Sequence, residues 1–324
     1  LMVCTFGDQT DVEWWRSEGL ALRQLVGRDG RLVPVTFGEE GFESRDADAA
    51  NACYDELAGL RVKQARAKIV ELLADPAGSA SGGGAPLQRE PRTIEHAVKF
   101  YERGDNPLEI LPTRQWFVRL LDKKPQLLAK GAEVAWHPDH MQARFRDWTE
   151  NLGLDWCISR QRYFGVPIPV WYPLDEGGER DYAAPIVAAP DSLPIDPMTD
   201  VPPGYEAAQR GKPGGFDGES DIFDTWFTSS LTPQVGSGWV LDPERHAKLY
   251  PADVRPQSHE IIRTWAFYTI AKSLLHEDSV PWHNVLISGW ILDPDRKKMS
   301  KSKGNVVTPL HLLEAHTSDG VRYW

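Results

Sequence analysis

The chain has 324 residues, of which 41% are hydrophobic and 10% aromatic, enough for the cores of two ordinary domains. Its formal net charge of −11 argues against a protein that coats nucleic acid with a broadly basic surface. No stretch reaches the roughly 18 consecutive apolar residues of a membrane-spanning helix, so the sequence predicts a cytoplasmic protein without membrane association. The three cysteines form no CxxC pair, which predicts neither a disulfide framework nor a protein-held metal.

The first third of the sequence is typical of an α+β unit. Residues 1–75 alternate short apolar strands with a helix expected over 49–73, where apolar residues recur at helical spacing. Residues 75–91 are rich in Gly, Ser, Ala and Pro, which predicts a flexible surface loop. Two further strands are expected over 97–101 and 108–111.

The middle of the chain has weaker patterns. A helix is expected over 115–131. Residues 166–172 are predicted to be extended because their two prolines exclude a helix interior. The many prolines and glycines of 173–218 indicate an irregular insertion.

The last third is typical of a parallel α/β sheet. A helix expected over 258–276 is followed by an apolar strand over 284–292, a polar loop over 293–305 and a helix opened by Thr308 and Pro309. Ligands of parallel sheets bind at the carboxyl ends of the strands. The polar loop, which we name the lysine loop, is therefore expected at the active edge.

The lysine loop carries a dense group of cations. Residues 298–305 read Lys-Met-Ser-Lys-Ser-Lys-Gly-Asn. Ammonium groups in such a loop can neutralise the charge that develops on a triphosphate, while Gly304 and the serines let the loop close and reopen. The same letters also fit a solvated basic turn. Met299 favours the functional interpretation, because an apolar residue among cations needs a place to pack.

Three blocks of the sequence carry a family resemblance. Residues 298–302 are identical to the KMSKS signature of the class I aminoacyl-tRNA synthetases. Residues 156–161 (WCISRQ) and 224–230 (DTWFTSS) resemble two further blocks of the valyl and isoleucyl branch, in the family's order. The Asp-Thr-Trp-Phe of 224–227 is more similar to valyl enzymes, since isoleucyl enzymes more often have another residue between Asp and Trp.

The resemblance implies roles for residues at the active edge. Lys298 and Lys301 would stabilise the triphosphate, and Glu260, which stands where the family usually has Asp, would accept hydrogen bonds from the ribose or the substrate ammonium. The implied catalytic residues are Lys298, Ser300, Lys301 and Ser302, and the implied ATP-binding residues are Lys298, Met299, Lys301, Glu260 and Gly289.

An amino-acid pocket is implied in the same way. Trp226, Ile261 and Trp265 would form its apolar wall, with Asp224 beside them. Rigid indoles suit a pocket for a branched aliphatic group. Simple core packing explains each tryptophan equally well, because the chain has 13 of them.

An acidic segment near the start resembles the editing domain of valyl enzymes. Residues 5–15 contain Asp8 and Asp11. An apolar pocket cannot strongly reject threonine against valine, so a second, hydrolytic site is needed. The resemblance implies that one carboxylate holds the ammonium of mischarged threonine while the other orients its hydroxyl or the attacking water. The spacing also fits a helix or turn cap.

The resemblance implies an α/β fold that combines the second half of a Rossmann-like parallel-sheet nucleotide-binding domain with part of an α+β, β-rich editing domain. Residues 1–112 would be the C-terminal part of the editing domain, 113–316 the second half of the catalytic domain, and 317–324 the start of a helical domain. Both ends look interrupted, which predicts an interior fragment that is inactive alone.

The implied activity of the parent protein is that of a valine–tRNA ligase with hydrolytic editing of threonyl-tRNA. Its partners would be valine, tRNA(Val) and ATP with Mg²⁺ as substrate, and the protein would be monomeric. An isoleucyl enzyme and a noncatalytic tRNA-binding or deacylating paralogue remain alternatives; the presence of both Lys298 and Lys301 counts against the paralogue. A P-loop phosphotransferase is disfavoured, since no GxxxxGK(S/T) motif occurs.

Overall fold

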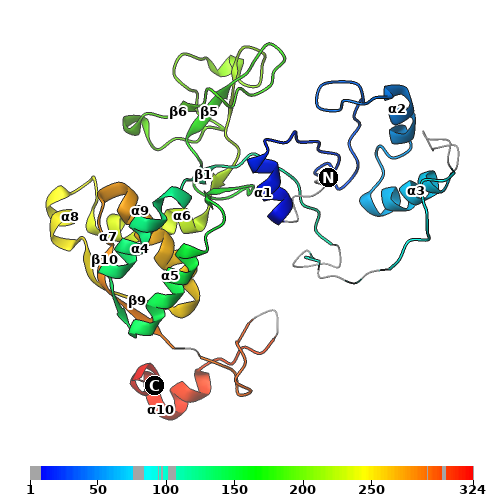
Figure 1. Ribbon diagram of the computed structural model, residues 1–324. Helices are drawn as coiled ribbons and strands as arrows, with labels where there is room; N and C mark the ends of the chain where they lie inside the picture. The colour runs from blue at the N-terminus through cyan, green and yellow to red at the C-terminus, as the bar shows by residue number, and fades with distance from the viewer. Residues whose placement is uncertain are drawn as a thin grey trace. The chain divides into compact units, whose positions relative to one another are not determined.

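The computed structural model describes residues 9–75, 84–93, 95, 98–100, 107–289, 291–300 and 304–323. The chain divides into two units, Leu1–Arg114 and Gln115–Trp324, whose elements are labelled in Figure 1. The division falls close to residue 112, where the sequence places a domain boundary.

The first unit holds three helices among its described residues: α1 (Gln9–Ser17), α2 (Ala47–Asp55) and α3 (Val62–Ala74). The single helix expected over 49–73 is therefore wrong. The chain turns between α2 and α3, where Gly59 adopts a φ of 77°, a left-handed conformation that favours glycine. The Asp46 carboxylate caps α2 by accepting a 3.0 Å hydrogen bond from the Ala49 amide.

The extended segments of the first unit pair only at isolated positions in the part that the structure describes. Val26 and Leu32 form one antiparallel bridge, and Phe100 and Pro107 form another. No regular strand is present among the described residues of this unit, so neither the expected β-rich character nor a strand over 108–111 is found there. The Tyr54 hydroxyl donates a 2.7 Å hydrogen bond to the Val33 carbonyl, which ties α2 to the preceding extended segment.

A parallel sheet lies at the centre of the second unit. Its strands are β2 (Ala135–His137), β10 (Trp282–Ser288) and β9 (Ala252–Ser258), in the order β2-β10-β9. Both neighbouring pairs are parallel, which confirms the predicted α/β class. The strand expected over 284–292 is shifted toward the N-terminus in the structure.

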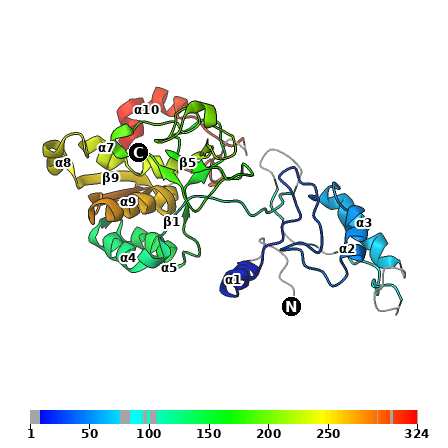
Figure 2. The same ribbon diagram turned by 90° about the horizontal axis from the view of Figure 1, so that it is seen from above.

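The helices around this sheet begin later than expected. α9 (Phe267–Glu277) follows a 3₁₀ turn (His259–Ile261) and a π turn (Ile262–Ala266), because residue 258 still pairs within β9. α4 (Lys124–Glu133) begins with Pro125 in its first turn, where proline is tolerated, rather than at residue 115. Figure 2 shows α9, and then α4 and α5 (Gln142–Glu150), on one side of β9.

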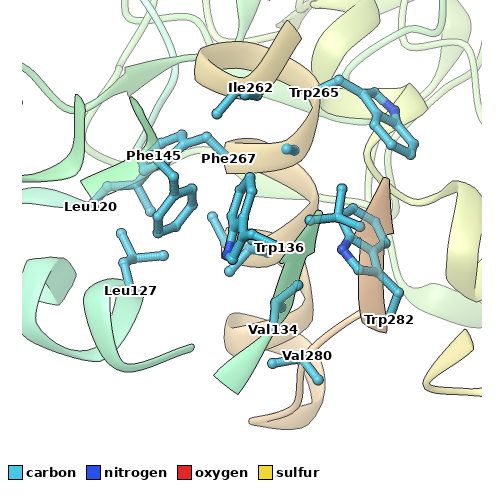
Figure 3. Packing of buried hydrophobic residues seen from close by; sticks show 14 of the residues in the cluster. Leu120, Leu127, Val134, Trp136, Phe145, Ile262, Trp265, Phe267, Val280 and Trp282 are labelled. Carbon is cyan, nitrogen blue, oxygen red and sulfur yellow. The ribbon is translucent and has the colours of Figure 1, made fainter. Parts of the chain in front are cut away.

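One apolar cluster joins these helices to the sheet. Trp282 is 1% exposed and Phe267 is fully buried, and Figure 3 shows side chains of the cluster on both sides of α9. Burial of such side chains is the main stabilising contribution in a domain of this kind. The labelled members are Leu120, Leu127, Val134, Trp136, Phe145, Ile262, Trp265, Phe267, Val280 and Trp282.

The insertion predicted as irregular over 173–218 contributes two strands to a small antiparallel sheet whose middle strand begins in the segment predicted as extended. β5 (Val170–Pro173) pairs with β6 (Ile186–Val187) on one side and with β7 (Phe216–Gly218) on the other. Trp171, Ala188 and Phe216 form a core of its own. The prolines and glycines of this segment therefore mark its turns and 3₁₀ segments, while short strands run between them.

The remaining elements of the second unit are short, apart from α10. Helix α10 bends at Thr317, which has a φ of 62°. None of the helices that the structure describes has the length and apolar character of a membrane span. The other elements are β1 (Phe117–Val118), β3 (Trp156–Cys157), β4 (Ser159–Arg160), β8 (Ile222–Phe223), α6 (Thr225–Ser229), α7 (Thr232–Ser237), α8 (Pro243–Leu249), α10 (Leu310–Tyr323) and the 3₁₀ turns Leu121–Lys123, Asp139–Met141, Pro190–Ser192 and Ala207–Gln209.

Candidate active site

The carboxyl ends of β9 and β10 lie side by side, with Ser258 opposite Ser288. The Ser258 hydroxyl accepts a 3.3 Å hydrogen bond from the Glu260 amide and so starts the turn after β9. Gly289 follows β10, and a Cβ atom built on it would meet no atom within 4 Å. The edge therefore presents an acidic side chain from one strand and open space beside the other, as expected for ligand binding at parallel strands.

Glu260 and Lys298 are brought together by the fold. The Lys298 ammonium forms an ion pair with Oε1 of Glu260, and the two side chains are 60% and 43% exposed. Lys298 lowers the pKa of the Glu260 carboxyl through this contact. Two residues that were predicted to bind different parts of ATP are thus direct neighbours.

The rest of the predicted signature lies along the lysine loop. The half-buried Met299 places its Sδ 3.3 Å from the Val307 amide. The Ser300 amide donates a 3.0 Å hydrogen bond to Oδ1 of Asn305. Lys301 and Ser302 lie outside the described residues.

Asp293 and Asn305 were not predicted as site residues, yet they lie at the two ends of the lysine loop and contact each other. The Asn305 Nδ2 donates a 2.8 Å hydrogen bond to Oδ2 of Asp293. The Lys297 amide and this Asn305 amide lower the pKa of the Asp293 carboxyl, with the Lys297 amide as the larger cause. The sequence signal that could have identified Asp293 and Asn305 is a carboxylate and an amide side chain at the two ends of a polar loop.

Trp265 is held rigidly beside the sheet edge. Its ring stacks on Trp282 with centroids 5.4 Å apart and an interplanar angle of 11°; both side chains are labelled in Figure 3. Its indole Nε1 donates a 3.3 Å hydrogen bond to the Ser229 carbonyl of α6, and the Arg255 guanidinium lies 3.6 Å from the ring centroid. Both the core-packing and the pocket interpretations of Trp265 fit this geometry.

Asp224 is engaged by protein groups on both carboxylate oxygens. Oδ1 caps α6 by accepting a 2.9 Å hydrogen bond from the Trp226 amide, and Oδ2 forms an ion pair with Arg160. The side chains of Trp226 and Ile261 are partly buried against the same cluster that contains Trp265. The sequence did not single out Arg160, although it lies within the WCISRQ block.

The first unit contains a separate candidate site. Asp8 lies outside the described residues, whereas Asp11 is in the first turn of α1. A hollow of about 1290 Å³ is lined by Asp11, Trp14, Trp15, Tyr54 and Arg66, among others. No cluster of three His, Cys, Asp or Glu side chains suited to a metal ion occurs among the residues that the structure describes.

The sequence matches the model of a known protein family. Residues 26–324 match the family described as tRNA synthetases class I (I, L, M and V). The chain belongs to this family.

Within the family, the relatives point to one member. The chain is 53% identical over its whole length to a valine–tRNA ligase of Salinispora tropica and 51% identical to one of Thermobifida fusca, which confirms the predicted valyl resemblance. It spans 36% of the length of each. Among solved structures, the methionyl-tRNA synthetase of Mycobacterium tuberculosis bound by methionyl-adenylate aligns with a TM-score of 0.42 and 21% identity, covering 64% of this chain and 32% of that one.

Proposed function

We propose that the full-length protein that carries this chain is a valine–tRNA ligase, which activates valine with ATP and transfers it to tRNA(Val). The observation that carries the proposal is the identity of 51–53% to valine–tRNA ligases along the entire chain. The proposal concerns the longer protein because the chain spans 36% of those relatives. A cytoplasmic, monomeric protein remains the expectation.

ATP would bind where Glu260 and Lys298 now pair with each other. A ribose hydroxyl would donate to the Glu260 carboxylate, and the Lys298 ammonium would turn to the phosphates with their Mg²⁺. As valine attacks the α-phosphate, negative charge moves onto the leaving pyrophosphate, and a lysine in place before the reaction stabilises that charge. Lys301 is proposed for the same role on the other side of Ser300.

Valine would lie against the indole of Trp265, whose orientation is fixed by Trp282 and Ser229. Trp226 and Ile261 are proposed as the other walls. An ordered apolar wall suits a branched aliphatic side chain. Asp224 would act mainly as the cap of α6 and the partner of Arg160, since both of its oxygens are already bonded.

The first unit would supply the hydrolytic correction of threonyl-tRNA. Discrimination between valine and the near-isosteric threonine is worth only about 10²-fold in an apolar pocket. The hollow beside Asp11, with its aromatic lining, supports this proposal because it can take up the aminoacylated end of a tRNA. Asp8 and Asp11 are proposed to bind the ammonium and to orient the hydroxyl or the attacking water.

The proposal is tested by ATP–pyrophosphate exchange on the full-length protein with valine, isoleucine or threonine. We expect the fastest exchange with valine, and a loss of roughly 10²-fold in Lys298→Ala, because a charge-stabilising group is removed. Lys297→Ala is the matched control: the Lys297 side chain is 72% exposed and its ammonium lies 3.8 Å from the exposed Asp295 carboxylate, so its effect should be small.

Two other results would contradict the proposal in different ways. Exchange supported by isoleucine alone would assign the protein to the isoleucyl enzymes. Binding of tRNA without exchange by any amino acid would identify a noncatalytic paralogue.

A further inference from the structure

We infer that Asp293 and Asn305 are positioning residues that brace the two ends of the lysine loop and set the place of Lys298. The inference rests on the proposed function, in which Lys298 acts on the triphosphate. It concerns polar side chains outside the KMSKS letters, and it follows from their hydrogen bonds.

Asn305 joins both arms of the loop through one side chain. Its Nδ2 donates a 2.8 Å hydrogen bond to Oδ2 of Asp293 and a 3.1 Å hydrogen bond to the Lys298 carbonyl. Its Oδ1 accepts a 3.0 Å hydrogen bond from the Ser300 amide. The backbone on either side of Met299 is therefore fixed to Asn305 at the end of the loop.

Asp293 closes the other half of the brace. Its Oδ1 accepts a 2.6 Å hydrogen bond from the Lys297 amide, while its own amide donates 3.0 Å to the Lys297 carbonyl. Arg296 adopts a φ of 60° in the turn between Asp293 and Lys297. Leu292 and Lys298 form an isolated antiparallel β-bridge across this turn. The turn therefore fixes the position of Lys298 beside Glu260.

The surroundings of the brace indicate that it positions the loop and contributes little to global stability. Asp293 is 9% exposed, whereas Leu292, at 38%, and Val306, at 49%, lie at the surface beside it. Among the described residues of this segment, none contributes a buried side chain to the central cluster. Loss of the brace should therefore displace Lys298 without unfolding the protein.

The test uses two single variants and their combination in the full-length protein. Asn305→Asp removes the amide N–H donors and sets two carboxylates against each other, and Asp293→Asn replaces one of the two oxygens that accept from Lys297 and Asn305 with an NH2 group. We expect each to slow valine-dependent pyrophosphate exchange by about 10- to 100-fold, because a displacement of about 1 Å is enough for losses of this size. The KM for valine should stay unchanged, since the loop acts on the phosphates.

The double variant Asp293→Asn with Asn305→Asp restores one amide-to-carboxylate hydrogen bond in the opposite direction. It should be at least about fivefold faster than the slower single variant, a coupling that independent sites do not show. Recovery remains incomplete because the bond to the Lys298 carbonyl is lost. Asp295→Asn is the control, as this carboxylate is 77% exposed.

Different outcomes overturn different claims. Single variants with the wild-type exchange rate, or a double variant no faster than the slower single one, would overturn the brace while leaving the ligase proposal intact. If the wild type itself shows no exchange, the ligase proposal fails. Hydrogen–deuterium exchange of backbone amides then tests the brace alone. Faster hydrogen exchange at the amides of Lys297 and Ser300 in the single variants supports the brace, and unchanged hydrogen exchange overturns it.

Discussion

Two lysines show how differently the helix layer and the lysine loop are built. Lys272 of α9 is 4% exposed, and its ammonium lies 3.2 Å from the centroid of the Phe227 ring. The Lys298 side chain is 60% exposed and pairs with a carboxylate. Side chains of the helix layer are held by burial, whereas those of the loop are held by hydrogen bonds. Substitutions should therefore change stability in the first region and activity in the second.

The largest expected effect is in the buried layer. Trp282→Ala should lower the free energy of unfolding by about 3–5 kcal/mol, because it removes a fully packed indole and leaves a cavity beneath Trp265. Urea unfolding of the chain, followed by circular dichroism, measures this loss.

Leu286→Ala is the matched control on the same strand. Leu286 is 45% exposed whereas Trp282 is 1% exposed, so little buried area is lost and the change should stay below about 1 kcal/mol. Equal losses for the two variants would show that the stability contributed by β10 does not follow the burial of its side chains.

A second comparison concerns two helical glycines. Gly131 in α4 packs against Phe145, and a Cβ atom on it would lie 2.1 Å from the ring, whereas one on Gly236 in α7 meets nothing within 4 Å. Gly131→Ala should destabilise the protein by about 2 kcal/mol through overpacking. Gly236→Ala should be neutral or stabilise by up to about 1 kcal/mol, since alanine favours helix. Thermal unfolding of both variants distinguishes them, and a stabilised Gly131→Ala would contradict the tight contact.

The contrast between regions also explains what the sequence can predict. The parallel sheet follows from the alternation of apolar strands and helices, which is a local pattern. The helix expected over 49–73 failed because Gly59 breaks it at a point where the apolar spacing continues. The predicted helix start at residue 258 was wrong for a tertiary reason, because pairing with β10 extends β9 to Ser258.

The candidate site divides in the same way. The lysine loop was located from its own residues, whereas other residues of the candidate site pair with partners from distant parts of the chain. Arg160 and Asp224 are separated by 64 positions, and Trp265 and Ser229 by 36. Such pairs depend on how the elements pack, which neither periodicity nor spacing contains. The roles assigned to the site residues therefore stay predictions until the exchange measurements are made.

The smallest expected effect comes from the buried cation itself. Burial lowers the pKa of Lys272 from 10.5 to about 8, and none of the described carboxylates forms an ion pair with it. Charging it in the folded protein costs about 3 kcal/mol relative to the unfolded chain, partly offset by about 1–2 kcal/mol from the Phe227 ring. Lys272→Met, of similar shape, should therefore stabilise the protein by about 1 kcal/mol at pH 7.

The pH dependence separates this explanation from simple repacking. Between pH 8 and 10.5 the unfolded lysine holds its proton while the folded one has lost it, so wild-type stability rises with pH through this window. The advantage of Lys272→Met should accordingly shrink above pH 8, and because the wild type gains about 1.4 kcal/mol per pH unit there, an advantage of about 1 kcal/mol should be lost within about one pH unit. Burial is the main cause of the lowered pKa of His276 and the charge of Lys272 contributes to it, so the variant should raise the pKa of that imidazole. An advantage that stays constant from pH 7 to 10.5 would mean that the folded and unfolded states hold the proton of Lys272 equally, and that burial does not lower the pKa of this lysine.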